Sequence, residues 1–309
     1  MSLDTPVALI IFNRPEKVKG ALQSIAAARP RQLFVIADGP RSSQPEDVAK
    51  CAAARAVIER VDWPCEVVKG YSDVNLGCGR RPSTGISWVF EQVEEAIILE
   101  DDCVPDPTFF PYCLELLQRY RHDERVMMVA GRNRFRMATP YSYCFCRNHS
   151  NWGWACWRRA WQHFDIGIKS WPKLRETSWL EETLGRPGAV QFWSDIFDRA
   201  YAADGQGDYW DYQWSFAMWA NNGLAAVPKV NLVRNMGFDE EATHTTAGAD
   251  ERASVPSGEM PFPLRHPPVV AQNKEYDDFV CDRVFPLRGP ENLYTKIRRK
   301  LLATVGVYY

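Results

Sequence analysis

The feature of this sequence that most constrains its fold is a regular alternation of short apolar runs with segments of helical periodicity between residues 7 and 100. The apolar runs occupy residues 7–12, 33–37, 65–69 and 96–99. The stretches between them carry apolar residues at helical spacing, as Val18, Leu22 and Ile25 do, and prolines stand where these helices would begin or end. Strands that alternate with helices in this way predict an α/β fold with a mainly parallel central sheet and helices on both faces.

The composition is that of an ordinary globular protein, because 46% of the 309 residues are hydrophobic and the formal net charge is −2. Since this charge balance gives no chain-wide attraction to phosphate backbones, we expect no nucleic-acid partner. No apolar run is long enough to span a bilayer and no signal peptide is recognisable, so a cytoplasmic location is expected. The odd number of cysteines, nine, favours reduced thiols, and the C-x-C pair Cys144 and Cys146 lacks the second pair that a zinc site needs.

Beyond residue 131 the alternation stops and the chain becomes rich in tryptophan. A helix is predicted over 106–120 and a strand over 126–130, and later helices are predicted over 157–163, 189–202 and 210–220. Residues 248–290 are rich in proline, which predicts an irregular surface segment. Residues 291–304 combine an apolar stripe with basic side chains, which is typical of a helix that packs on the domain or rests on an anionic membrane surface.

Polar residues follow three of the predicted strands at the point where each strand ends. They are Asn13 and Arg14 after the first strand, Asp38 after the second, and an acidic loop of Glu100, Asp101 and Asp102 after the fourth. Because ligands of open parallel sheets bind beyond the carboxyl ends of the strands, these residues are expected to share one site. A dinucleotide fingerprint and a P-loop are both absent from the sequence, which disfavours a dehydrogenase or a P-loop enzyme.

The acidic loop is the strongest candidate for metal binding. Extended backbone would place Glu100 and Asp102 on one face and Asp101 on the other. Clustered carboxylates in a crevice have raised pKa values unless a cation compensates them, and their hard oxygen atoms favour Mg²⁺ or Mn²⁺. The alternative is a solvated turn or an acidic cluster at the start of a helix.

The other strand-end residues have weaker signals. The Asp38 carboxylate is suited to accept the imide N–H of a uracil ring, although Asp-Gly-Pro is also an ordinary turn sequence. Arg14 is a candidate for neutralising phosphate or, alternatively, for capping the edge of the sheet. Arg81 is a less specific candidate for the same phosphate contact.

These loops resemble those of nucleotide-diphospho-sugar glycosyltransferases of the GT-A fold. The similarity lies in residues 7–15, the Ala37-Asp38-Gly39 turn, and residues 99–110, where the acidic loop resembles the variant D-x-D motif of the N-acetylglucosaminyltransferase I type and its bacterial relatives. The resemblance implies a Mn²⁺ (or Mg²⁺) cofactor held by Asp102. It also implies that Glu100 and Asp101 lie near the sugar and ribose of the donor, and it adds Asn13, Arg14, Asp38 and Arg81 as donor-binding candidates.

The resemblance extends into the second half of the chain. Residues 152–154 resemble a Gly-Trp segment below the acceptor pocket, and residues 209–214 resemble a Trp-Asp-x-x-Trp helix that supplies the catalytic base. This implies that Asp211 is the base and that Trp154 and Trp210 lie on the acceptor side, with Trp210 and Trp214 forming a partly apolar wall that raises the pKa of the base. From spacing alone, core packing of these tryptophans and a helix-capping role for Asp211 are the favoured interpretation, and only the resemblance reverses it.

A last similarity concerns residues 235–238 and 242–245, which resemble a stretch that closes over the donor. His244 is the histidine that this implicates, as a second metal ligand or as a donor to the diphosphate, and the alternative is a structural histidine. The stretch between Trp154 and Trp210 looks longer than in the eukaryotic enzymes, so the identity of the acceptor does not carry over.

Together these features predict a metal-dependent, inverting glycosyltransferase that transfers a sugar from a nucleotide-diphosphate donor, with a UDP-sugar favoured, to a glycan or lipid-linked acceptor. Residues 1–131 would form the nucleotide-sugar-binding half and residues 132–247 the acceptor and catalytic half of the same domain. Residues 248–309 would form a Pro-rich wrap and a basic helix, with possible peripheral membrane contact through 291–304. A non-catalytic carbohydrate-binding protein on the same fold and a nucleotidyltransferase are the alternatives.

Overall fold

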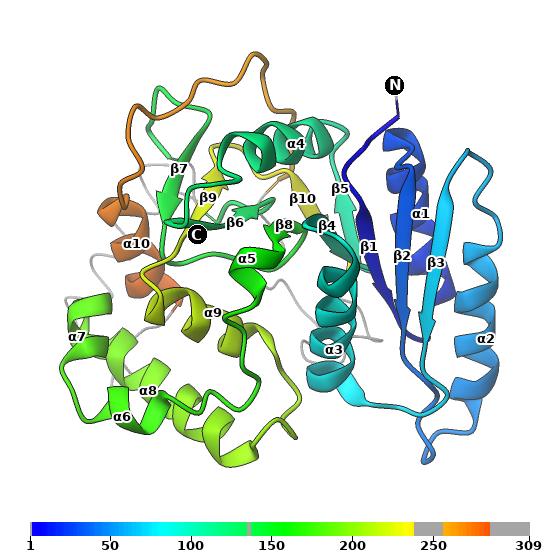
Figure 1. Ribbon diagram of the computed structural model, residues 1–309, viewed down its shortest axis with the longest axis horizontal. Coiled ribbons are helices and arrows are strands. Elements are labelled where there is room, and N and C mark those ends of the chain that lie inside the picture. The colour runs from blue at the N-terminus through cyan, green and yellow to red at the C-terminus, as the bar shows by residue number, and fades with distance from the viewer. Residues whose placement is uncertain (1, 135–136, 238–255, 285–309) are drawn as a thin grey trace.

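The computed structural model of the chain describes residues 2–134, 137–237 and 256–284. Its main feature is an eight-stranded sheet in the order β3-β2-β1-β4-β8-β6-β9-β7 (Figure 1). The strands are β1 (Val7–Ile11), β2 (Gln32–Ala37), β3 (Glu66–Tyr71), β4 (Glu95–Glu100), β6 (Val126–Ala130), β7 (Tyr143–Cys146), β8 (Trp154–Trp157) and β9 (Leu224–Pro228). A second, two-stranded antiparallel sheet pairs β5 (Cys103–Pro105) with β10 (Val233–Asn235).

Most strands of the large sheet run in one direction. Strands β3, β2, β1 and β4 are mutually parallel, and β6 and β9 form a second parallel pair. Strand β8 is antiparallel to both β4 and β6 and so joins the two parallel groups, while β7 is antiparallel to β9 at the edge. The predicted α/β class with a mainly parallel central sheet is therefore confirmed.

Helices cover both faces of this sheet, as the sequence predicts. The helices are α1 (Pro15–Ala28), α2 (Glu46–Ile58), α3 (Gly77–Gln92), α4 (Phe109–Arg119), α5 (Arg158–Trp161), α6 (Trp171–Arg175), α7 (Trp179–Leu184), α8 (Pro187–Ala203), α9 (Asp211–Ala220) and α10 (Lys274–Val284). One hydrophobic core lies between the sheet and α1, α2 and α4, and the other lies on the face covered by α3 and α5–α10. Figure 1 shows α1 and α2 at one side of the molecule and α6–α9 at the other.

Strands β1, β2 and β4 form where the continuous apolar runs stand, because these strands lie in the interior of the sheet, whereas β3 is an edge strand with no fully buried residue. All five residues of β1 and the last five of β2 are buried. Along β4, Ala96 and Ile98 enter one core while Ile97 and Leu99 enter the other, so both faces need apolar side chains. Helix α1 begins with Pro15 at its first turn and ends at Arg29, which has the left-handed conformation.

The second half contains more strand than the sequence predicts. The sequence predicts no strand for β5, β7, β8, β9 or β10, and Trp157 belongs to β8 instead of opening the helix predicted over 157–163. These strands are only three to five residues long. All four residues of β7 and all four of β8 are buried, so these two strands show no alternation that distinguishes strand from helix.

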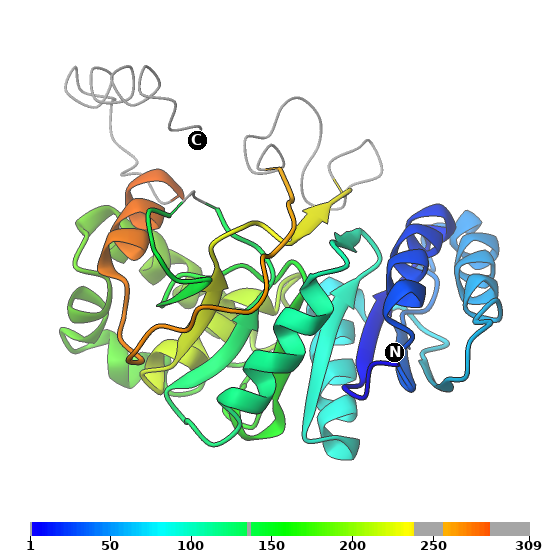
Figure 2. The same cartoon turned by 90° about the horizontal axis from the view of Figure 1, so that it is seen from above.

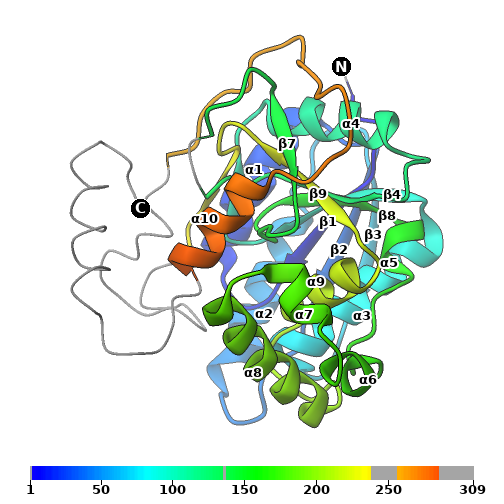
Figure 3. The ribbon, with the colours of Figure 1, turned by 90° about the vertical axis from the view of Figure 1, so that its left-hand side faces the viewer.

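The Pro-rich segment also departs from its prediction. Residues 256–273 run along the outside of the later strands without regular helix, and the amide of Ser142 donates to the Arg265 carbonyl over 2.8 Å (Figure 2). The chain then forms α10, where the proline-rich sequence predicted irregular structure. This helix packs against β7 and α8 (Figure 3). Tyr276 and Val280 supply its buried stripe.

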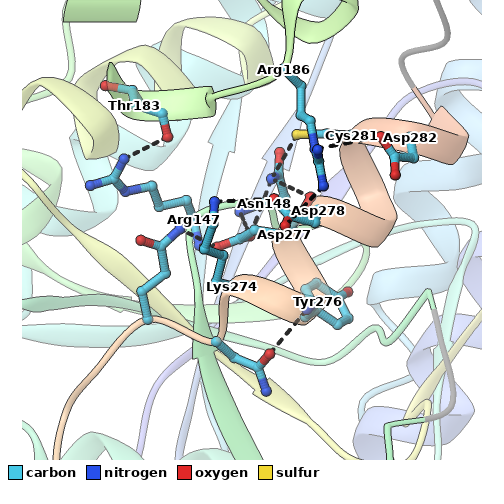
Figure 4. Close-up of polar contacts among 12 residues, drawn as sticks. Arg147, Asn148, Thr183, Arg186, Lys274, Tyr276, Asp277, Asp278, Cys281 and Asp282 are labelled. Carbon is cyan, nitrogen blue, oxygen red and sulfur yellow. Dashed lines mark hydrogen bonds and ion pairs between the residues drawn. The ribbon is translucent and has the colours of Figure 1, made fainter. Parts of the chain in front are cut away.

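A buried carboxylate holds α10 in place. Asp277 accepts hydrogen bonds from the backbone amides of Arg147 (3.0 Å) and Asn148 (2.8 Å), which follow β7, and from the Gln272 side chain (Figure 4). On the outer side, Arg186 pairs with Asp278. The acidic residue Asp277 is therefore buried and hydrogen-bonded, although nothing in the sequence around it predicts burial.

The large sheet contains strands from both 1–131 and 132–247, and the predicted division of the chain into two halves and a C-terminal segment stays a prediction. His244 and the basic stretch 291–304 lie outside the described residues, so their predicted roles stay predictions. Among the helices of the described part, none is long and apolar enough to cross a membrane.

Candidate functional site

The strand-end residues gather at one edge of the large sheet. Register pairs Ile11 of β1 with Ala37 of β2 and Ile10 with Glu100 of β4, so the residues that follow these strands lie side by side. Trp154, at the start of antiparallel β8, pairs with both Ile98 and Ala130 and therefore lies at the same edge. This is the edge at which open α/β sheets bind their ligands.

The acidic loop is held by Arg14, which precedes α1. The Arg14 guanidinium forms a short ion pair with Asp101, to which Nε also donates over 3.3 Å, and its Nη2 donates to Oδ2 of Asp102 over 3.2 Å. Both aspartates are reached by one arginine because the chain turns after Glu100, so the expected alternation of Asp101 and Asp102 between two faces is wrong. The side chain of Asp101 is 2% exposed and that of Asp102 is 14% exposed.

Charge and burial shift the titration of this loop strongly. Burial raises the pKa of Glu100 to about 8, and the negative charges of Asp102, Asp101 and Asp211 add to the shift while Arg14 opposes it. Burial also raises the pKa of Asp101 to about 6, against the opposing charge of Arg14. Burial lowers the pKa of Arg14, but the charges of the adjacent aspartates raise it by more than burial lowers it. The guanidinium therefore stays charged.

Asp211 reaches the acidic loop from the other half of the chain. It is the first residue of α9, where a carboxylate interacts favourably with the helix dipole. Its charge contributes to the raised pKa of Glu100, so the two carboxyl groups lie within electrostatic range of each other. The structure thus brings the acidic loop near Asp211, although Asp211 lies 109 positions after Asp102 in the sequence.

The loop that precedes α9 packs tightly on the start of α3. A Cβ atom at Gly79 would lie 2.1 Å from the Gly207 carbonyl oxygen, so only glycine permits this approach. Beside it, burial raises the pKa of the Cys78 thiol, and the charges of Asp208, Glu100 and Asp38 add to the shift. Cys78 and Asp208 were not identified from the sequence, where the one available signal was the polar, glycine-containing stretch before the Trp-Asp-x-x-Trp pattern.

Asp38 has a well-defined structural role. Its carboxylate accepts hydrogen bonds from the backbone amides of Gly39 (2.9 Å), Leu76 (2.9 Å) and Gly77 (3.0 Å) and from the side chain of Asn75 (3.0 Å). A carboxylate offers about four lone-pair positions, so these donors occupy them. Asp38 therefore caps the start of α3 from a neighbouring strand, and its predicted contact with uracil stays a prediction.

Asn13 and Arg81 are also engaged within the protein. The Asn13 amide donates to Oδ1 of Asp47 over 2.7 Å, and the same carboxylate accepts from Nε of Arg41 over 2.6 Å. Arg81 donates from Nε to the Ala37 carbonyl over 3.1 Å and from Nη2 to the Gly70 carbonyl. Both side chains thus fasten the ends of β1, β2 and β3, and their predicted contacts with a donor stay predictions.

Trp154 and Trp210 lie inside an aromatic cluster. Trp154 is 1% exposed, and its ring lies 5.8 Å from both Trp210 and Trp214, measured between centroids. Trp161 packs on Trp214 from the side, with a centroid distance of 5.1 Å. These tryptophans therefore form the support on which the first turn of α9, and with it Asp211, is held.

The donor atoms of the acidic loop are compatible with a divalent ion. Among the described residues, no group of three or more His, Cys, Asp or Glu side chains is arranged as a complete metal site. Mg²⁺ and Mn²⁺ do not require one, because they are commonly held by one or two carboxylates together with substrate phosphates and water. Arg14 pairs with Asp101 and Asp102 but not with Glu100, and Lys17 adds positive charge near Asp101. The negative charges of Asp101 and Asp102 act on Glu100, so the loop fits such an ion.

A further contact to Asp102 comes from β10. The side-chain amide of Asn235 donates to Oδ1 of Asp102 over 3.2 Å. The backbone amide of Met236 donates to the backbone carbonyl of Asp102 over 2.8 Å. The sequence marked residues 235–238 only through resemblance and assigned Asn235 no role. A contact across 133 residues has no local signal.

Comparisons with known proteins place the chain among distant structural neighbours. No protein-family model and no curated protein matches the sequence. Solved structures with limited similarity include a mannosyltransferase from Pyrobaculum calidifontis in complex with GDP-Man and Mn²⁺ (13% identity, 72% of this chain and 71% of that chain, TM-score 0.38). Mouse xyloside xylosyltransferase 1 (14%, 73% and 85%, TM-score 0.35) and a UDP-glucose pyrophosphorylase complexed with UDP-glucose (10%, 74% and 93%, TM-score 0.37) are further examples.

Proposed function

We propose that this protein is a GT-A-type, metal-dependent, inverting glycosyltransferase that transfers a sugar from a UDP-sugar to a glycan or lipid-linked acceptor. The observation that carries the proposal is that the acidic loop, at the end of β4, and Asp211, at the start of α9, lie within electrostatic range of each other. Carboxylates that disfavour one another's ionised forms require a compensating charge, and a ligand that brings a cation supplies it.

The acidic loop and Arg14 would bind the donor. Asp102, the more exposed of the two aspartates, would hold Mn²⁺ or Mg²⁺ together with the donor's phosphate oxygens. When bound, the ion stabilises the negative charge that develops on the leaving diphosphate. Arg14 already contacts both aspartates and would keep their carboxylates oriented, while Glu100 and Asp101 would line the sugar and ribose.

Asp211 would act as the general base. In an inverting transfer, the acceptor hydroxyl oxygen bonds to the anomeric carbon as the bond from that carbon to the diphosphate oxygen breaks. The hydroxyl proton passes to the Asp211 carboxylate, and the electron pair of the broken bond leaves with the diphosphate. The buried Trp154–Trp210–Trp214 cluster would hold this carboxylate in place. A base held in the correct orientation lowers the activation barrier more than a mobile one, because less entropy is lost on reaching the transition state.

A binding experiment tests the proposal directly. UDP and GDP are titrated into the protein with Mn²⁺ and with a chelator, and thermal stability and calorimetric heat are both recorded. We expect UDP to stabilise the protein only when Mn²⁺ is present, by about 2.7 kcal/mol at a hundredfold excess over its Kd. Hydrolysis or transfer of the sugar from a UDP-sugar then provides the activity assay.

The same experiment separates the two alternatives. Stabilisation by free glycans, with no effect of nucleotide and Mn²⁺, would favour a non-catalytic carbohydrate-binding protein. Binding of a nucleoside triphosphate together with a sugar phosphate, followed by pyrophosphate release, would favour a nucleotidyltransferase. No stabilisation by UDP with Mn²⁺ and no transfer from any UDP-sugar would contradict the proposal.

A further inference from the structure

The two-stranded sheet places a short segment of the second half directly against Asp102. Register in this sheet pairs Asn235 of β10 with Cys103 of β5, the residue after Asp102. The Met236 amide donates to the Asp102 carbonyl over 2.8 Å, so the backbone of the acidic loop is fixed to this segment as well as to β1. Residues 235–237 therefore have a defined position relative to the Asp102 carboxylate.

The Asn235 side chain connects two groups that lie on either side of it. Its Nδ2 donates to Oδ1 of Asp102 over 3.2 Å, and its Oδ1 accepts from the backbone amide of Gly237 over 2.6 Å. The hydrogen bond to Gly237 fixes which end of the amide carries the oxygen, because the backbone amide can only donate. The NH₂ group is thereby aimed at Asp102.

Gly237 completes the arrangement by leaving room for the carboxylate. A Cβ atom at this position would lie 2.5 Å from Oδ2 of Asp102 and 2.8 Å from Oδ1 of Asn235. Real Cβ atoms do not approach oxygen so closely, so a side chain here would displace the carboxylate or the Asn235 amide. The short separation allows the segment to lie against Asp102 without covering it with a side chain.

Asp102 is consequently held from two directions. Arg14 donates to Oδ2 over 3.2 Å and Asn235 donates to Oδ1 over 3.2 Å. Oδ1 also accepts a weak hydrogen bond from the Cys103 thiol over 3.7 Å, whereas Oδ2 keeps its second lone pair, so Oδ2 retains acceptor capacity for an ion. Partners of this kind fix the orientation of a metal-binding carboxylate, and their loss commonly lowers ion affinity 10- to 100-fold.

We propose that Asn235 is a positioning residue that orients the Asp102 carboxylate for a divalent ion, with Gly237 providing the space this requires. The inference rests on the proposed function, because it assumes that Asp102 receives the ion. It adds Asn235 to the acidic loop and Arg14, which follow β4 and β1, as a second residue from the later half of the chain beside Asp211.

Two substitutions of Asn235 separate positioning from a purely local role. Asn235→Asp keeps the oxygen that accepts from Gly237 but replaces the donor to Asp102 with a second acceptor. Asn235→Ala removes both hydrogen bonds. Met236→Ala is the matched control, because the Met236 side chain is 48% exposed and its backbone amide is unchanged by the substitution.

The primary readout is Mn²⁺ affinity, measured by the electron paramagnetic resonance signal of free Mn²⁺ in the presence of UDP, with urea unfolding as the check on folding. We expect Asn235→Asp and Asn235→Ala to weaken Mn²⁺ binding about tenfold and Met236→Ala to leave it unchanged. Gly237→Ala retains the Asn235 side chain but crowds Asp102, so it should also weaken Mn²⁺ binding. This variant replaces the Asn235 variants as the test if those do not fold.

The contrary outcomes are distinct. Mn²⁺ binding by folded Asn235→Asp that is as tight as, or tighter than, that of the unaltered protein overturns the positioning role, while Mn²⁺-dependent UDP binding by the unaltered protein leaves the proposed function standing. If the Asn235 variants do not fold, unchanged Mn²⁺ binding by Gly237→Ala overturns the inference. If the unaltered protein itself binds no UDP with Mn²⁺, the proposed function fails, and the inference fails at its premise.

Discussion

The ends of β2 and β4 occupy equivalent places on either side of β1, yet their carboxylates have opposite surroundings. Asp38, after β2, accepts hydrogen bonds from three backbone amides and one side-chain amide. Burial raises the pKa of both carboxyl groups, but the hydrogen bonds to Asp38 oppose the shift there, whereas the charges of Asp102, Asp101 and Asp211 add to it at Glu100 and bring its pKa to about 8. A carboxylate at the end of a strand is thus either hydrogen-bonded within the protein or part of an acidic cluster, according to whether its neighbours supply donors or further acids.

Sequence position alone does not distinguish Asp38 from Glu100, because the difference between them lies in tertiary contacts. Both follow an apolar strand, and both were predicted to bind the donor. Their roles diverge because the loop 75–77 turns its amides toward Asp38, whereas α9 brings a further carboxylate toward Glu100. Substitutions on the two sides should therefore affect different measurable properties.

The largest effect is expected at Asp211, on the β4 side. Asp211→Asn removes the proposed base but keeps the size of the side chain, so donor binding should persist while turnover falls about 10³-fold. Steady-state kinetics with a UDP-sugar and calorimetric titration of UDP with Mn²⁺ measure the two quantities. Near-normal turnover in this variant would show that the base lies elsewhere, and an equal loss of UDP affinity would show that Asp211 supports binding instead of proton transfer.

The next largest effect is expected at Asp102. Asp102→Ala should weaken Mn²⁺-dependent UDP binding by about a hundredfold, because it removes the proposed ion ligand. The free energy of unfolding without ligand should change little, since the side chain is part of a crowded acidic loop and removing one charge relieves repulsion. Calorimetry and urea unfolding on the same preparation test both statements. Unchanged UDP affinity would remove Asp102 from the mechanism.

Asp38 should give the opposite pattern. Asp38→Asn places an NH₂ group where the backbone amides of residues 76 and 77 donate, so some buried donors lose their acceptor. We expect a loss of about 3 kcal/mol in the free energy of unfolding, with Mn²⁺-dependent UDP affinity changed less than about threefold in the folded protein. Unchanged stability together with a changed preference between UDP and GDP would instead assign Asp38 to the nucleobase.

The fold on the β1–β4 side could be predicted closely because its determinants are local. Buried parallel strands must be continuously apolar, and the helices between them carry their own start and stop signals, as Pro15 does for α1. In the second half, β7 reads Tyr-Cys-Phe-Cys and β8 reads Trp-Ala-Cys-Trp, and both are buried throughout. Such short apolar segments are compatible with several structures, so their place in the sheet depends on tertiary contacts.

The site divides in the same way. The acidic loop could be placed at the sheet edge from the topology alone, because it directly follows a recognisable strand. The partners that define each role could not, since all donors to Asp38 except the Gly39 amide come from residues 37 to 39 positions away, and Asn235 lies 133 positions from Asp102. No local pattern encodes such contacts, and helix and strand signals carry no information about which side chains meet.

The smallest expected effect concerns a second structural carboxylate beside the β2 end. Asp47 is fully buried, and its hydrogen bonds from Arg41, with that of Asn13, lower its pKa to about 2 even though burial opposes the shift. A carboxylate whose folded pKa lies below its unfolded value of about 3.9 contributes stability that is present above pH 4 and is lost as the pH falls toward 2. The contribution is about 1–2 kcal/mol, since Arg41 is partly exposed and solvent screens the pair.

Other carboxylates titrate in the same range, so the informative quantity is the difference in unfolding free energy between the unaltered protein and Asp47→Asn. Urea unfolding at pH 6 and pH 3 should show this difference shrinking as the pH falls. At pH 3 Asp47 protonates mainly in the unfolded chain, which stabilises the unfolded state of the unaltered protein but not that of Asp47→Asn. A difference that stays constant across this interval would mean that the pKa of Asp47 does not change on folding, so the folded protein would not favour its ionised form. The contrast with the acidic loop would then rest on the donors to Asp38 alone.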